Sequence, residues 1–156
     1  MNLAVGSLAT SAEAAPVTYR VTIETSEDGT DNTVKARMFD ASGRPSSWTE
    51  FDKSGYNDFE RGDHDTYAIK VPSNFGRPAK LQLWKGGNDD WCFAPWVRVT
   101  SPDGVQGGMG ASAAAAHLCL TEESEHQETV TASDGTTYTK QYYHHYLPPS
   151  PIDWPR

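Results

Sequence analysis

The chain has 156 residues, 37% of them hydrophobic and 22% charged, and its 13 Lys and Arg against 21 Asp and Glu give a formal net charge of −8. This composition predicts one globular domain with a single core, and the negative charge argues against nucleic acid as the main partner, because phosphate binding needs clustered Lys and Arg. No apolar run approaches the ~20 residues of a membrane-spanning helix, so no transmembrane segment is expected.

The first sixteen residues are interpreted as lying outside the fold. They hold a short apolar stretch followed by Ala12-Glu13-Ala14. This is the small-x-small pattern that signal peptidase cuts, although the basic region of a complete signal is missing. Residues 1–16 are therefore either the remnant of a secretory signal or a disordered leader. The first alternative predicts a secreted, extracellular protein.

Hydrophobic residues alternate with polar ones from Val17 onward, which is typical of half-buried strands. After residues 17–24, similar segments occur at residues 34–38, 67–71, 81–83, 97–99 and 118–120, separated by turns rich in Gly, Asn, Asp and Pro. No segment shows a convincing helical period. Short strands separated by such turns predict an all-β fold, specifically an antiparallel β-sandwich.

Two further strands are expected near the C-terminus, at residues 128–132 and 136–143. Ser133-Asp134-Gly135 joins them, and Asp-Gly favours the tight turn of a β-hairpin. The Pro-rich stretch after Leu147 cannot continue a central strand and is expected to run over the surface. Residues 17–123 are thus predicted to form the sandwich, on which the hairpin and tail of residues 124–156 pack.

Cys92 and Cys119 are the two cysteines of the chain. A disulfide between them would close a loop of about 27 residues and stabilise the fold by roughly 3–4 kcal/mol. Such a bond would agree with export from the cell. Two buried free thiols are the alternative, whereas a metal site built on them would need more Cys or His at ligand spacing.

Three turns at predicted strand ends are rich in oxygen ligands. They are residues 26–32, 56–58 and 88–90. Carboxylates, amides and backbone carbonyls are the ligands that Ca²⁺ prefers, and Gly29 allows carbonyls to turn inward. The first turn is not an EF-hand, because the alternating ligands and the terminal Glu are absent. The turns either converge on Ca²⁺ or are solvated acidic loops.

Several motifs, taken in order, resemble the PLAT (LH2) domain of lipoxygenases, pancreatic-type lipases, polycystins and clostridial phospholipase C toxins. They are residues 19–25, Gly29-Thr30-Asp31, residues 57–62 and 65–67, Leu81-x-Leu83, residues 90–93 and Val97-x-Val99. The resemblance covers Val17 to about Thr100, with residues 118–120 as a candidate for the last core strand. It implies an antiparallel sandwich of two four-stranded sheets, in agreement with the alternation.

Similarity to the toxin members implies one or two Ca²⁺ ions. The first would be held by Glu27 or Asp28 with Gly29, Asp90 and the Trp91 carbonyl. The second would be held by Thr30, Asp31, Asn57 and Asp58. Asp31 could instead cap backbone N–H groups, as the corresponding residue does in many members of the family, so both roles stay open for it.

Tryptophans supply the candidate contact residues. The alternation places Trp84 and Trp96 on outward faces, and Trp48 lies in a loop. Exposed Trp is typical of membrane and partner interfaces. We therefore expect lipid or partner contact at all three, with cover by the C-terminal extension as the alternative for Trp84 and Trp96. Trp91 is expected in the core.

No catalytic signature of the G-x-S-x-G, H-E-x-x-H or P-loop type occurs, and Asp63-His64-Asp65 is interpreted as a polar turn, so no enzyme is expected. The resemblance implies a non-catalytic module that associates with lipid or membrane surfaces with the help of Ca²⁺. The candidate signal remnant adds secretion, and a monomer is expected. The alternative is a module that binds a secreted protein, as partner or inhibitor of an enzyme, through the C-terminal extension.

Overall fold

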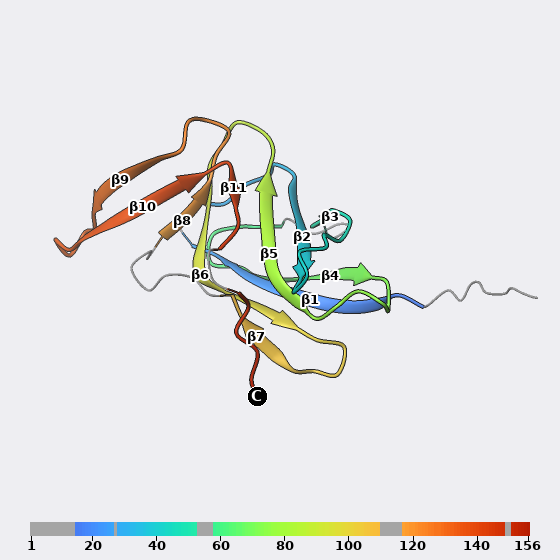
Figure 1. Cartoon of the computed structure of the whole chain (residues 1–156). Coiled ribbons are helices and arrows are strands. Elements are labelled where there is room, and N and C mark those ends of the chain that lie inside the picture. Colours follow the sequence, from blue (N-terminus) through green and yellow to red (C-terminus); the bar gives the residue numbers. More distant parts are fainter. Residues whose placement is uncertain (1–14, 27, 53–57, 110–116, 149–150) are drawn as a thin grey trace, which may run out of the picture.

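The computed structural model describes residues 15–26, 28–52, 58–109, 117–148 and 151–156, and these residues form strands and no helix (Figure 1). The strands are β1 (Val17–Thr25), β2 (Val34–Asp40), β3 (Thr49–Glu50), β4 (His64–Val71), β5 (Pro78–Lys85), β6 (Trp91–Thr100), β7 (Gln106–Gly108), β8 (His117–Leu120), β9 (His126–Thr131), β10 (Thr137–Tyr143) and β11 (His145–Tyr146). A helix able to cross a membrane is absent from these residues. The predicted all-β class is confirmed.

The strands form two sheets that share one core. The larger has seven strands in the order β4-β1-β6-β8-β10-β9, with β7 paired on β6, and the smaller has four in the order β11-β5-β2-β3. The sandwich is therefore confirmed, but its sheets hold seven and four strands rather than four each. The larger sheet grows because β10 of the C-terminal hairpin pairs in parallel with β8, so that β9 and β10 extend beyond the sandwich (Figure 1).

Alternation along each strand determines which side chains enter the core. In β4 every second residue is buried and its neighbours are exposed. In β2 the outward residues are half-buried. Successive side chains of a strand point to opposite faces, so each strand gives one apolar face to the interior. The large apolar side chains that the strands bury include Ile23, Ile69, Trp91, Phe93, Leu118 and Leu120 from the larger sheet and Met38, Leu81 and Leu83 from the smaller.

A disulfide joins Cys92 and Cys119, which lie opposite each other in the pair formed by β6 and β8. Both residues are fully buried, and Tyr142 of β10 packs against them. Of the two alternatives raised by the sequence, the disulfide is the one that the structure has. The bond ties β8, the strand before the C-terminal hairpin, to β6 of the sandwich.

The last residues return to the sandwich core. Ile152 is buried, its N–H donates to the Ala79 carbonyl at 2.6 Å, and Asp153 pairs with Gly108, the last residue of β7. Gly107 is required for this contact, because a Cβ there would lie 2.8 Å from both Ile152 and Trp154. The C-terminal residues thus cover one edge of the core.

Candidate functional site

Three loops meet at one end of the sandwich. The loop after β1, the turn before β4 and the loop between β5 and β6 are linked through Thr30. Its N–H donates to the Phe59 carbonyl at 3.1 Å, and its hydroxyl donates to Asp89 Oδ1 at 2.6 Å. Because Thr30 is almost fully buried, these bonds hold the three acidic turns together.

The contact between the first two loops depends on Gly29 and Phe59. A Cβ on Gly29 would lie 2.5 Å from the Phe59 carbonyl oxygen, so only glycine fits this close approach. Phe59 has a φ of 60°, a left-handed conformation that is unusual for an aromatic residue. Its N–H is held by the buried carboxylate of Asp65 at 3.0 Å.

The interpretation of Asp63-His64-Asp65 as a polar turn is therefore corrected. His64 and Asp65 belong to β4, and Asp65 points inward. The signal was present in the sequence, because Asp65 precedes Tyr67, Ile69 and Val71 at a spacing of two. A carboxylate on the inner face can remain there because it accepts a backbone N–H that would otherwise be unsatisfied.

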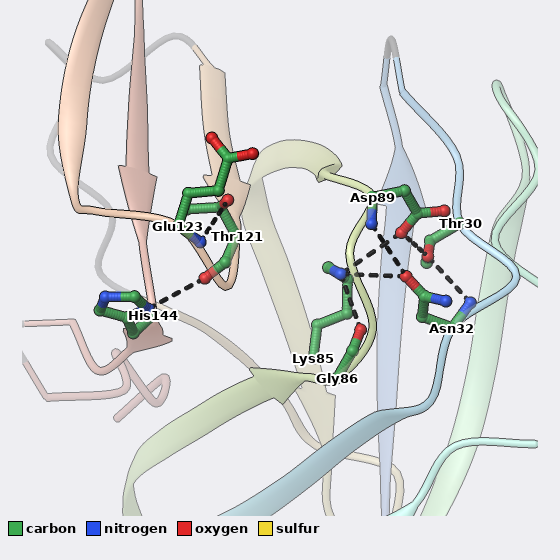
Figure 2. Close-up of polar contacts among 8 residues, drawn as sticks. All are labelled: Thr30, Asn32, Lys85, Gly86, Asp89, Thr121, Glu123 and His144. Atoms are coloured by element: carbon green, nitrogen blue, oxygen red, sulfur yellow. Dashed lines mark hydrogen bonds and ion pairs between the residues drawn. The ribbon is translucent and has the colours of Figure 1, made fainter.

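Lys85 is a buried cation at the same end of the sandwich. Its side chain is 0% exposed. The ammonium donates to Asn32 Oδ1 at 3.2 Å, to the Gly86 carbonyl at 2.7 Å and to Asp89 Oδ1 at 3.3 Å (Figure 2). Three N–H groups thus have three acceptors, which is what a buried ammonium requires. Leu81 and Leu83 precede Lys85 at a spacing of two, so the alternation of β5 already places Lys85 on the inner face.

The ligand set implied for a first ion lies where β1 ends beside β6. The Asp28 carbonyl accepts the Cys92 N–H at 2.9 Å, and Gly29 follows directly. Trp91 is fully buried, as expected, and its indole N–H donates to Thr25 Oγ1 at 3.0 Å. Glu27 lies outside the described residues. Backbone geometry therefore brings Asp28 and Trp91 together.

An ammonium already lies on this first set. Lys140 Nζ of β10 is 3.2 Å from Asp28 Oδ2, and the Lys140 side chain is only 12% exposed. A calcium ion bound by the same carboxylate would face this fixed positive charge. The residues present here therefore do not fit Ca²⁺ as well as the sequence motif implies.

The set implied for a second ion lines an open cavity of about 330 Å³. Thr30, Asp31 and Asp58 contribute to its wall, together with Glu50 and Asp52. The set consists of hydroxyl and carboxylate oxygens, the donor chemistry that fits a hard divalent cation. Asn57 lies outside the described residues. No three His, Cys, Asp or Glu side chains are grouped as a metal site within the part of the chain that is described.

Thr30 and Asp31 have different roles in the turn. The Thr30 hydroxyl accepts the Asn32 N–H at 2.9 Å and so caps the backbone, whereas the Asp31 side chain is exposed. On the other side of the cavity, Asp58 Oδ1 accepts the Tyr67 hydroxyl. Asp31 is thus accessible to a ligand from solvent, and Asp58 is held in position by Tyr67.

The three candidate contact tryptophans lie on two different faces. Trp96 is 36% exposed on β6 of the larger sheet, where its ring stacks on His64 at a centroid distance of 5.7 Å. Trp48 is 38% exposed beside β3, and Trp84 is half-buried on β5 beside His145 of β11, both in the smaller sheet. The tryptophans therefore do not form one contact surface.

Burial raises the pKa of three phenols in the C-terminal strands, those of Tyr142, Tyr143 and Tyr146. Burial raises the pKa of Tyr146 to about 12, with a smaller contribution from Tyr143. Burial also raises the pKa of Tyr142 to about 12, and its hydroxyl donates to Glu128 Oε1 at 3.1 Å. Both hydroxyls stay protonated at neutral pH, so they add no charge to the acidic end of the sandwich.

Comparison with known proteins identifies the fold. The sequence model of the PLAT/LH2 domain matches residues 19–109. Among solved structures, coral 8R-lipoxygenase aligns with a TM-score of 0.51 and 18% identity over 88% of this chain and 17% of its own. The alpha toxin of Clostridium absonum aligns with a TM-score of 0.51 and 20% identity over 83% of this chain and 32% of its own.

These structural likenesses concern the fold, because identity is low and the chain spans less than a third of either protein's length. The coral enzyme is described as activated by calcium through a C2-like domain. No curated protein matches the sequence significantly.

Proposed function

The chain belongs to the PLAT/LH2 domain family, and on that premise we propose that it is a secreted, non-catalytic module that associates with lipid or membrane surfaces with the help of Ca²⁺. The observation that carries the proposal is the oxygen-lined cavity at the end where the acidic loops meet. The buried disulfide supports secretion, because such bonds persist in oxidising compartments. Calcium activation of the coral lipoxygenase through its C2-like domain supports the choice of ion.

One ion rather than two is proposed, at the cavity of the second ligand set. Asp31 and Asp58 would hold it with Thr30, while Glu50 and Asp52 add negative charge to the wall. Bound there, Ca²⁺ would supply a positive charge able to contact an anionic lipid headgroup. The buried Lys85 and Asp65 fix the loops around the cavity, so that less ordering is needed on binding.

A second candidate function is protein binding through the C-terminal hairpin. β9 is the last strand of the larger sheet, and almost all of its residues are exposed. A free edge strand can pair with an extended segment of another protein. This arrangement favours the alternative in which the chain is a partner or inhibitor of a secreted enzyme.

Sedimentation with phosphatidylserine-containing vesicles tests the proposed function. We expect the protein to pellet with vesicles in millimolar Ca²⁺ and to remain in solution in EDTA. Asp58→Asn should weaken pelleting, because it removes a charge from the cavity and keeps an oxygen for Tyr67. Asp134→Asn, in the turn between β9 and β10, is the matched control and should pellet normally. Equal pelleting in Ca²⁺ and EDTA would overturn the calcium-assisted mechanism.

A further inference from the structure

The outer face of the smaller sheet carries aromatic and basic side chains together. The outward residues of β2, β5 and β11 lie on this face, together with Trp48, which directly precedes β3. They share the face because alternate residues of paired strands point to the same side of a sheet. We name this surface the aromatic–basic face and define it by Trp48, Trp84, Lys35, Arg37, Lys80 and His145. None of its residues belongs to the calcium ligand sets implied by the sequence.

Each tryptophan on this face lies beside a cation. The Arg37 guanidinium is 4.5 Å from the ring centroid of Trp48, and the Lys35 ammonium is 5.3 Å from that of Trp84. These cation–π contacts hold the rings close to the sheet. The two rings are therefore preorganised against the sheet and do not project as free anchors.

The charge of this face is opposite to that of the whole chain. Lys35, Arg37 and Lys80 contribute three permanent positive charges, and Glu50, paired with Lys35 in the register of β2 and β3, is a carboxylate beside them. The chain as a whole has a net charge of −8. A local excess of positive charge on an acidic protein selects an anionic partner.

A hollow between the two tryptophans gives the size of what could bind. Lys35, Trp48, Trp84 and His145 line a cavity of about 200 Å³. Its wall is mainly aromatic, with one ammonium. An indole face carries partial negative charge and attracts the C–H groups of a sugar ring, while the ammonium attracts a carboxylate. A membrane surface is flat and would leave this hollow unfilled.

We propose that the aromatic–basic face binds an acidic polysaccharide, with one uronate ring seated between Trp48 and Trp84 and its carboxylate on Lys35. Arg37 lies two residues after Lys35 on β2, and Lys80 of β5 pairs with Phe39 two residues further on. Both would contact the acidic groups of adjacent sugar units. This function goes beyond lipid association and does not depend on Ca²⁺.

Affinity electrophoresis in gels that contain polygalacturonate tests the proposal. All runs contain EDTA, so that calcium bridges and the proposed lipid function do not contribute. We expect retardation by polygalacturonate and little by neutral hydroxyethylcellulose. Trp48→Ala and Lys35→Gln should each weaken binding about tenfold.

Trp96→Ala is the matched control, because Trp96 is similarly exposed and has Arg98 at 5.3 Å but lies on the other sheet. It should bind as the unchanged protein does. Equal retardation by hydroxyethylcellulose and polygalacturonate, equal loss in Trp96→Ala or no retardation at all would overturn the proposal. Loss of vesicle binding in Trp48→Ala without any glycan binding would assign the face to lipid instead and would also overturn it.

Discussion

Lys140 places its ammonium 3.2 Å from the carboxylate of Asp28, a residue 112 positions earlier in the chain. The contact connects the C-terminal hairpin to the loop that carries the calcium motif of the family. A tethered ammonium thus lies where an ion of the first set would contact Asp28. The C-terminal strands therefore change the chemistry of the loop end as well as lengthening the larger sheet.

Replacing Lys140 should expose a latent calcium site. Lys140→Gln removes the ammonium from Asp28, so we expect Ca²⁺ binding by isothermal titration to become stronger or to gain a second site. In EDTA the free energy of unfolding should change by less than about 1 kcal/mol, because one partner is half exposed. Lys70→Gln, an exposed lysine of β4, is the control for net charge. Unchanged calcium binding in Lys140→Gln would show that Lys140 does not block the first set.

Calcium should stabilise the folded protein through the second set. For a Kd of about 10⁻⁴ M and about 2 mM Ca²⁺, binding to the folded state alone adds roughly 1.8 kcal/mol, or several degrees in Tm. Asp58→Asn should lose most of this gain, and Asp28→Asn should keep it because Asp28 already faces Lys140. Differential scanning calorimetry in EDTA and in Ca²⁺ measures both. An equal Tm in the two buffers would show that the acidic turns are solvated loops without a bound ion.

The buried Lys85 should be essential for stability. Lys85→Met keeps the length of the side chain but removes its hydrogen bonds to Asn32, Gly86 and Asp89. We expect a loss of about 2–3 kcal/mol, because the buried Gly86 carbonyl loses its charged donor. Urea denaturation measures the loss, and Lys70→Met controls for the removal of an exposed ammonium. An unchanged midpoint would mean that the cost of burying the charge equals what its hydrogen bonds contribute.

Local periodicity was enough to predict the longer strands and the sandwich, but not the short strands β3, β7 and β11. It also contained the inward positions of Lys85 and Asp65, but Asp65 was assigned to a polar turn and Lys85 was not singled out. The parallel pairing of β10 with β8 and the contact of Lys140 with Asp28 had no local signal. Such contacts depend on where a distant hairpin docks, and neither alternation nor turn residues specify that position.

Alkaline pH should unfold the protein through its buried phenols. Tyr146 is 5% exposed, and burial raises its pKa to about 12 from a usual value near 10. Because the folded state holds this proton more tightly, its contribution to stability is complete below pH ~10 and is lost as the pH rises towards ~12. We therefore expect the urea midpoint to fall across this interval. Tyr146→Phe, which cannot ionise, should flatten the decline, whereas Tyr138→Phe in the hairpin should not. An equally steep decline in Tyr146→Phe would show that other groups cause the alkaline transition.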